Sequence, residues 1–420
     1  MRSVRPPGRW VPEVANCYSC CVSVGSMSDA VKIAELIGNA KIVAIGENNH
    51  HVHEFGDLRN RLLRELVEHH GFRVVGFESG FAEGELVQDW LNGAPGDVVD
   101  VGRDGFTFSL GESPEAHEML TWLRERGDVR YYGLDVPSSA GSPLPSLDAV
   151  RAYLSTVDEA ATGLVDEAIE ATKCYASVSS AEAPAKYAAL DAAAKDKATA
   201  ALTRLKTHLA SLRPVYGDTA VAEHHVEGAL RLDAYLAEVA AMMSGSAPAL
   251  QSGSRDAYMA ESVRLIRRLH GDDTKIVVML HNGHLQRVPF SPFPGLTAPS
   301  AGTHLAAEFG DDYFALGLTA VKGETTGLKP DPAARLGFTV YRQELDAPAD
   351  GSVEAEGPGL VDLRPRRGTK GPQSIRHAHL FNAVDVVDAF DALVCFPEST
   401  VSGHLRPAPA DRVVEVAPRG

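Results

Sequence analysis

Carboxylates and histidines follow three short apolar segments that lie far apart in the chain. The segments and the groups after them are 41–46 with Glu47 and His50, 73–77 with Glu78, and 275–280 with His281 and His284. Such apolar runs are typical of strands, and in an open α/β sheet ligands bind beyond the carboxyl ends of the strands. If the strands share one edge, all these acid and base groups meet in one pocket. That arrangement would make the protein an enzyme.

Glu47 and His50 lie three residues apart in a loop rich in Asn and His. A carboxylate beside an imidazole fixes the tautomer of the ring and raises its basicity, which a general base acting on water requires. The alternative is a polar loop on the surface. The catalytic interpretation is favoured because the other two segments also end in carboxylates or histidines.

Glu78 follows an apolar run, where a charge is costly to bury unless it is paired or hydrogen-bonded. Glu78 therefore faces either the polar groups of the site or an arginine of the preceding helix, Arg59 or Arg61. Asp135 occupies the equivalent place after the next strand. It belongs to the site or caps a helix or loop.

His281 and His284 are the most specific feature, because two imidazoles after a buried strand seldom serve packing alone. One could be a base and the other an acid or a donor to an oxyanion. Capping of the strand end is the structural alternative. Arg255 opens a helix between Ser254 and Asp256, where it could bind an oxyanion or a substrate carbonyl, although the spacing alone favours a surface ion pair.

Several catalytic motifs are missing. The chain contains no Gly-x-Ser-x-Gly elbow, no Gly-x-Gly-x-x-Gly after a strand and no Gly-x-x-x-x-Gly-Lys-Ser/Thr loop. Serine-triad, dinucleotide and nucleoside triphosphate chemistry therefore lack their usual frameworks. Water is the favoured nucleophile. Sets of two histidines and one carboxylate also bind divalent metals in hydrolases, so a metal-dependent reaction stays open.

The order of elements predicts an α/β fold with a parallel-rich central sheet flanked by helices and an inserted all-helical subdomain. The evidence is a strand–helix–strand unit from 41 to 78, which implies a right-handed crossover. A further helix, Pro114–Arg126, leads to strand 129–134. From 147 to about 243 the chain is Ala-rich with long helical periodicity, broken at Pro214 and again at 244–254. Strands return at 274–280, 312–319 and 388–397, and the Pro- and Gly-rich stretches 289–299 and 347–359 are expected to be loops.

These observations divide the chain into four parts. We expect residues 1–26 to be a disordered N-terminal extension, 27–143 and 253–420 to be the two parts of the core, and 144–252 to be a helical insertion that walls the substrate cleft. Cys17, Cys20 and Cys21 in the extension are expected to be free thiols, since no second Cys or His pair completes a tetrahedral metal site.

Composition limits the class of protein. The chain has 420 residues, 44% hydrophobic and 23% charged, and its formal charge is −16 from 40 basic and 56 acidic side chains. That charge argues against nucleic acid or an anionic membrane surface as partner and favours a neutral or cationic small molecule. No apolar run reaches the roughly 18 residues of a membrane span, and an odd number of cysteines points to a reducing compartment. We expect a soluble, cytoplasmic protein.

The residues resemble those of the erythromycin esterase family. The matching segments run from about residue 30 to about 400 and are Val43–His50, Glu54–Phe55, Leu58–Arg59, Leu62–Arg64, Gly71–Glu78, Ser254–Asp256, Val277–His284, Gly302–Leu305, Phe309–Gly317 and Phe390–Val394. The resemblance implies a parallel-rich α/β core with an inserted helical subdomain and hydrolysis of a macrolide lactone by an activated water. The chain departs from the usual pattern at His51, where a glycine is common, and at Asn48 and Asn49, where small residues are usual. These departures bear on macrolide specificity more than on hydrolysis.

By this resemblance the active-site set is Glu47, His50, Arg59, Glu78, His281 and His284, with His50 or one of the later pair as general base. Distant relatives bind haem or metal, which keeps the metal interpretation open. We interpret Glu47, His50, Glu78, His281 and His284 as catalytic, and Arg59, Arg255, Asp135 and His51 as substrate-binding. No cofactor and no metal ligand are assigned.

The first hypothesis is a metal-independent hydrolase of an ester or lactone of a natural-product-type small molecule of the macrolide or polyketide-like class, with oxyanion stabilisation by Arg59 or the second imidazole. The alternatives are a non-hydrolytic acid/base step, such as dehydration or ring closure in secondary metabolism, a metal-dependent hydrolase with the same His/Glu cluster, and a resistance protein that binds without turnover. The oligomeric state and the substrate are left open by the sequence.

Overall fold

The central sheet of the computed structural model, which describes residues 27–293 and 295–405, has the strand order β3-β2-β4-β1-β7-β12-β9, with β8 paired to β7. Its strands are β1 (Ile42–Ile45), β2 (Val74–Gly80), β3 (Arg130–Asp135), β4 (Ile276–Met279), β7 (Tyr313–Pro330), β8 (Phe338–Glu344), β9 (Gly359–Asp362) and β12 (Ala392–Ser399). The six strands from β3 to β12 pair in parallel, and β8 and β9 are antiparallel. The predicted parallel-rich α/β core is confirmed.

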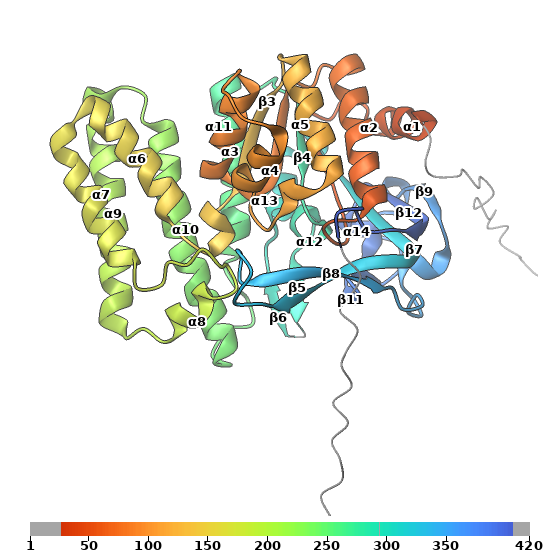
Figure 1. Ribbon diagram of the computed structural model, residues 1–420. Helices are drawn as coiled ribbons and strands as arrows, with labels where there is room; N and C mark the ends of the chain where they lie inside the picture. Colours follow the sequence, from red (N-terminus) through yellow and green to blue (C-terminus); the bar gives the residue numbers. More distant parts are fainter. Residues whose placement is uncertain (1–26, 294, 406–420) are drawn as a thin grey trace, which may run out of the picture.

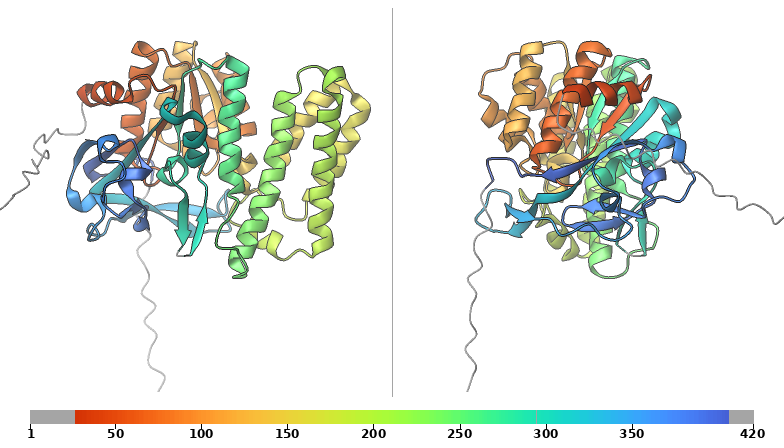
Figure 2. Two further views of the ribbon diagram at one scale, coloured as in Figure 1. Left: turned by 180° about the vertical axis from the view of Figure 1, so that it is seen from behind. Right: turned by 90° about the vertical axis from the view of Figure 1, so that its right-hand side faces the viewer.

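The central strands β1, β2 and β4 are buried on both faces, as a parallel sheet covered by helices requires. Val43 and Ile45 of β1 belong to one apolar cluster, and Ile42 and Ala44 belong to another on the opposite face. Helices α1, α2 and α5 cover the first face and α11 and α13 the second; α2 and α5 lie in front of the sheet in Figure 1, and α11 comes forward in the view from behind in Figure 2. The core helices are α1 (Met27–Ile37), α2 (His53–His69), α3 (Phe81–Leu91), α4 (Val98–Gly105), α5 (Pro114–Arg126), α11 (Ser254–His270), α12 (Asn282–Leu285), α13 (Ala301–Phe309) and α14 (Val386–Ala389).

A second group of helices stands beside the sheet, at the left of Figure 1, and has its own apolar cluster. Its members are α6 (Leu144–Val157), α7 (Thr162–Thr172), α8 (Ala183–Ala188), α9 (Ala192–Tyr216) and α10 (Ala220–Met243). Phe81 and Tyr258 from the core join this cluster. The expected break at Pro214 is wrong by two residues: α9 continues to Tyr216, since a proline near the end of a helix removes little hydrogen bonding.

The sequence failed to predict several short strands in the last third of the chain. Segment 289–299, expected to be a loop, contains the antiparallel hairpin of β5 (Phe290–Phe293) and β6 (Leu296–Ala298). The strand predicted at 312–319 continues as β7 to Pro330 and returns through β8. A third hairpin joins β10 (Ser374–His377) to β11 (Leu380–Ala383). β5, β6 and β11 lie low in Figure 1, near β8.

The predictions for residues 1–26, including the three cysteines there, lie outside the described residues. Among residues 27–293 and 295–405, the longest helices are too polar to span a bilayer.

Candidate active site

The predicted meeting of the three strand ends is present, because β2, β4 and β1 are adjacent and parallel in the sheet. The loops after β1 and β4 are joined by a backbone hydrogen bond from Asn282 N to Glu47 O (2.8 Å). The side chain of Asn282 bonds to both the N–H and the C=O of Leu318 on β7. Gly46 leaves room for that side chain, since a Cβ there would lie 2.0 Å from Asn282 Oδ1. The loops after β1 and β4 are thus fixed against each other.

Glu47 joins His50 to Arg59. Its Oε1 lies 2.8 Å from His50 Nδ1, and its Oε2 lies 2.9 Å from Arg59 Nη1. Arg59 is buried on α2 and also donates to the carbonyls of Ile45, Gly46 and Leu280. Burial raises the pKa of Glu47, but the Arg59 charge and the His50 hydrogen bond outweigh it and keep the pKa below its ordinary value. Glu47 is therefore an anion that holds the Nδ1–H of His50.

His50 keeps its second ring nitrogen free. The side chain is 26% exposed, and no described residue forms a hydrogen bond with Nε2. Burial lowers the pKa of His50, but the hydrogen bond and charge of Glu47, with the charge of Glu78, raise it above the ordinary value. A ring with Nδ1–H held by a carboxylate and Nε2 open to solvent has the geometry of a general base.

Glu78 is the anionic centre of the second half of the site. Its Oε2 accepts the backbone N–H of His281 at 2.5 Å, and its Oε1 lies 3.3 Å from both His284 Nε2 and Arg255 Nη2. Burial raises its pKa, but the charges of His284, His50 and Arg255 bring it well below the ordinary value. His284 and Arg255 are thus the cationic partners of Glu78. The alternative of an ion pair with Arg59 or Arg61 is not the one formed, because Arg59 is turned toward Glu47.

His281 is neutral, and both its ring nitrogens are bonded to the backbone. Nδ1 accepts the N–H of Gly283 at 3.0 Å, so Nε2 carries the proton and donates to the carbonyl of Asn48 at 2.7 Å. Burial, followed by the charges of nearby histidines, lowers its pKa well below the ordinary value. In this arrangement His281 has no nitrogen available to take a proton from water.

His284 is held as an imidazolium. Its Nδ1 lies 2.8 Å from Asp256 Oδ1 and its Nε2 lies 3.3 Å from Glu78 Oε1. Although burial lowers its pKa, the two carboxylates raise it to about 10. At neutral pH His284 therefore supplies positive charge and two donors to the site, and it cannot act as a base.

Arg255 and Asp135 form a pair at the back of the site. Arg255 Nε and Nη2 contact both oxygens of Asp135 at 2.6–3.0 Å, and Asp135 is completely buried. The expectation of a surface ion pair for Arg255 is therefore wrong, because the first turn of α11 abuts the end of β3. Both residues face protein groups in this structure, and their predicted contact with substrate remains a prediction.

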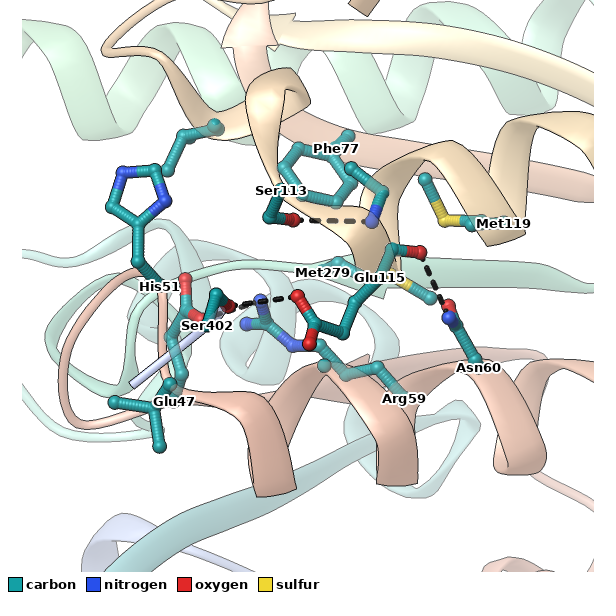
Figure 3. A pocket seen from close by; sticks show the side chains of 14 residues that line it. Glu47, His51, Arg59, Asn60, Phe77, Ser113, Glu115, Met119, Met279 and Ser402 are labelled. Carbon is teal, nitrogen blue, oxygen red and sulfur yellow. Dashed lines mark hydrogen bonds and ion pairs between the residues drawn. The ribbon is translucent and has the colours of Figure 1, made fainter. Parts of the chain in front are cut away.

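His51 has a left-handed backbone conformation, with φ of 60°, which glycine adopts more readily than other residues. Its ring is buried; Nε2 lies 3.3 Å from Ser109 Oγ, and the ring of His404 lies 5.4 Å away. Burial, followed by the charge of His50, lowers its pKa to about 3. The ring points away from Glu47 in Figure 3.

A cavity of about 50 Å³ lies behind Glu47 and Arg59, on the side of α2 and α5. Figure 3 shows Glu115 between Ser402 and Asn60, with the Ser402 hydroxyl donating to the Glu115 carboxylate at 2.7 Å. The space holds a few water molecules at most. It is too small for a natural product, and His50 is not among the residues that line it.

His377 is a residue of the site that the sequence interpretation missed. Its ring centroid lies 4.4 Å from that of His281, whose ring is in turn 6.0 Å from His50 and 6.4 Å from His284. We call His50, His281, His284 and His377 the imidazole cluster. The one signal in the sequence is a second histidine two residues later, His379, shortly after the Pro- and Gly-containing stretch 365–372.

Among residues 27–293 and 295–405, no three His, Cys, Asp or Glu side chains are arranged as a metal site. The predicted site residues brought together are thus Glu47, His50 and Arg59 on one side of His281, and Glu78, His284, Arg255 and Asp135 on the other. His51 lies among Ser109 and His404 instead.

Comparison with known proteins gives consistent matches. The family model described as erythromycin esterase matches residues 67–399. The chain is 30% identical over 393 residues to erythromycin esterase type II of Escherichia coli, covering 89% of this chain and 93% of that one. It is 30% identical over 384 residues to erythromycin esterase type I of Escherichia coli, covering 86% and 92%. The solved structure of a mutant of the erythromycin esterase EreC in its open conformation matches with a TM-score of 0.79 and 27% identity, covering 91% of this chain and 96% of that one.

Proposed function

The chain belongs to the erythromycin esterase family, and we propose that it is a hydrolase that opens a carboxylic ester or lactone of a small molecule with a water activated by His50. The single observation that carries this proposal is the Glu47–His50 pair, in which Nδ1 is held and Nε2 is open. The family match and the two relatives named as erythromycin esterases support the reaction class.

The choice of His50 as base follows by comparison within the imidazole cluster. His281 has both nitrogens bonded to backbone groups, and His284 is charged at neutral pH. His50 Nε2 can accept the proton of a water molecule as that water attacks the acyl carbon. The imidazolium so formed is stabilised by the Glu47 carboxylate, which is itself fixed by Arg59.

The second half of the reaction returns the proton. The tetrahedral intermediate breaks its C–O bond, and the leaving alkoxide takes the proton from His50, so that the base is regenerated. In a lactone the alkoxide remains tethered to the new carboxylate, and the product is a hydroxy acid. The two positive charges of His284 and Arg255 are outnumbered by the carboxylates of Glu78, Asp256 and Asp135, so an oxyanion at the acyl carbon depends on a directed hydrogen bond for its stabilisation.

The substrate class follows from charge and from the relatives. The formal charge of −16 favours a neutral or cationic molecule, and erythromycin, a macrolide lactone, is named in the relatives' descriptions. The first test is to incubate the purified full chain with erythromycin and with p-nitrophenyl acetate and to measure products by mass spectrometry. From erythromycin we expect a product heavier by one water, and from p-nitrophenyl acetate we expect p-nitrophenol and acetate. A product lighter by one water would instead indicate a dehydratase.

The same assay after dialysis against a chelator separates the metal-dependent alternative. Activity that survives dialysis is expected for catalysis by His50. Activity that is lost and then restored by a divalent cation would contradict it.

A further inference from the structure

His377 is a second imidazole of the cluster whose ring is not committed to the protein. No described residue forms a hydrogen bond with either of its ring nitrogens, and the side chain is half-buried. Both nitrogens of His281 and both of His284 are bonded to protein groups. Within the described part of the cluster, His50 Nε2 and the His377 ring are thus the nitrogens open to a ligand.

The backbone around His377 is held in place by hydrogen bonds of its two neighbours. The next residue, Ala378, donates its N–H at 2.8 Å to the carbonyl of Asn48, the same oxygen that accepts from His281 Nε2. The preceding residue, Arg376, is completely buried and donates to the carbonyls of Ala320, Val321 and Asp346. The β10–β11 hairpin is therefore anchored to the loop that carries His50, and the backbone that carries His377 is fixed beside that loop.

The charge state of His377 suits a donor. Burial, followed by the charges of His284 and His50, lowers its pKa to about 4. At neutral pH the ring is uncharged and carries one N–H, which can donate a hydrogen bond. Phe290, 5.8 Å away between ring centroids, shields the ring on another side.

The position of His377 in the imidazole cluster suits a contact with the acyl group of a substrate. His50 and His377 are both neighbours of His281, at 6.0 Å and 4.4 Å between ring centroids, so we infer that one ester group in front of His281 is within reach of both rings. Arg59 is turned into the protein toward three carbonyls and Glu47, which leaves it poorly placed for the oxygen of a substrate.

We propose that His377 donates its ring N–H to the acyl oxygen of the substrate and stabilises the oxyanion that forms when the water held by His50 attacks. This role rests on the proposed ester hydrolysis. No proton is transferred by His377: water gives its proton to His50, the acyl oxygen gains the negative charge, and the hydrogen bond from His377 strengthens with that charge. A neutral imidazole is chemically suited to this task.

The test compares three variants of the full chain, with erythromycin and p-nitrophenyl acetate as probes. His377→Phe keeps an aromatic ring against His281 and Phe290 but removes the N–H. His377→Gln restores an N–H donor on a side chain of similar reach. His379→Phe, two residues away on the same hairpin and exposed, is the matched control.

We expect His377→Phe to lower kcat by about 10²- to 10³-fold, the loss typical of one oxyanion donor, with KM changed by less than about threefold because the contact forms mainly in the transition state. His377→Gln should recover about tenfold or more of that loss, and His379→Phe should match the wild type. Thermal unfolding of each variant shows whether it is folded. If His377→Phe does not fold, His377→Ala takes its place, because the smaller alanine side chain cannot clash with its neighbours.

The outcomes separate the two proposals. A folded His377→Phe or His377→Ala protein with wild-type kcat overturns the role of His377 and leaves ester hydrolysis standing. A loss confined to KM, or a loss that Gln does not reduce, also overturns it, because a packing role would give that result. A wild-type protein that hydrolyses neither probe overturns both proposals together.

Discussion

Replacing Glu47 by Gln is expected to remove most of the activity, because the carboxylate serves two donors at once. Its two oxygens face His50 Nδ1 at 2.8 Å and Arg59 Nη1 at 2.9 Å, and Figure 3 shows the Glu47 and Arg59 side chains close together. An amide has one oxygen and one NH₂ group. If the oxygen faces His50, the NH₂ group opposes Arg59. If the NH₂ group faces His50, the ring must accept at Nδ1 and carry its proton on Nε2, which is the wrong tautomer for a base.

The magnitude follows from these two arrangements. The wrong tautomer removes general-base catalysis, and loss of the corresponding carboxylate in a catalytic triad costs about 10⁴-fold in kcat. We therefore expect Glu47→Gln to lower kcat/KM by about 10³- to 10⁴-fold. It also leaves the buried Arg59 charge without its carboxylate, which should lower the free energy of unfolding by about 3 kcal/mol. The bonds of Arg59 to three carbonyls keep this cost at the lower end of the range.

The assay is the pH dependence of kcat/KM, compared with that of the wild type and of Glu54→Gln as a control in the first turn of α2. Glu47 raises the pKa of His50, so the wild-type rate should fall on the acid side at a pH above the ordinary value for histidine, about 6.5. In Glu47→Gln that fall should move to lower pH. Wild-type activity with an unchanged acid limb in the folded variant would refute the assignment of the pair.

Two further predictions concern the other carboxylates. Glu78→Gln should lower the free energy of unfolding by about 3–5 kcal/mol, because the amide must oppose either the His281 N–H or the two cations; urea unfolding with a loss under 1 kcal/mol would contradict the buried network. Asp256→Asn should alter the pH dependence of stability. The pKa of His284 is raised to about 10, so its stabilising contribution is complete below about pH 6.5 and is lost as pH rises to about 10. The thermal midpoint of the wild type should fall more steeply over that interval than that of Asp256→Asn, and parallel curves for the two proteins would show that the ion pair does not set the pKa.

The sequence was most informative where acid and base residues directly follow a short apolar run. β1, β2 and β4 are strand-length apolar runs, which led us to expect parallel strands with Glu47, His50, Glu78 and His281 together at one edge. The strands do pair in parallel. The partners of these groups were harder to predict. Arg255 meets Asp135 across 120 residues of chain, and spacing along the sequence carries no information on such a contact.

The last third of the chain was predicted least well, again for a physical reason. β5, β6, β10 and β11 have three or four residues each, too few to show an alternating pattern, and proline and glycine stand around them. His377 was missed for this reason. Its place in the site depends on the bond between Ala378 and Asn48, which joins positions 330 residues apart.

The most direct test of the account is the activity of His50→Gln. Gln keeps a polar side chain but cannot take a proton at neutral pH, so we expect kcat to fall by about 10²- to 10⁴-fold, with thermal unfolding close to that of the wild type. His53→Gln is the matched control, since His53 also pairs with a glutamate, Glu115 at 2.6 Å, but lies outside the imidazole cluster. A folded His50→Gln protein that hydrolyses the substrate at the wild-type rate would contradict the central claim.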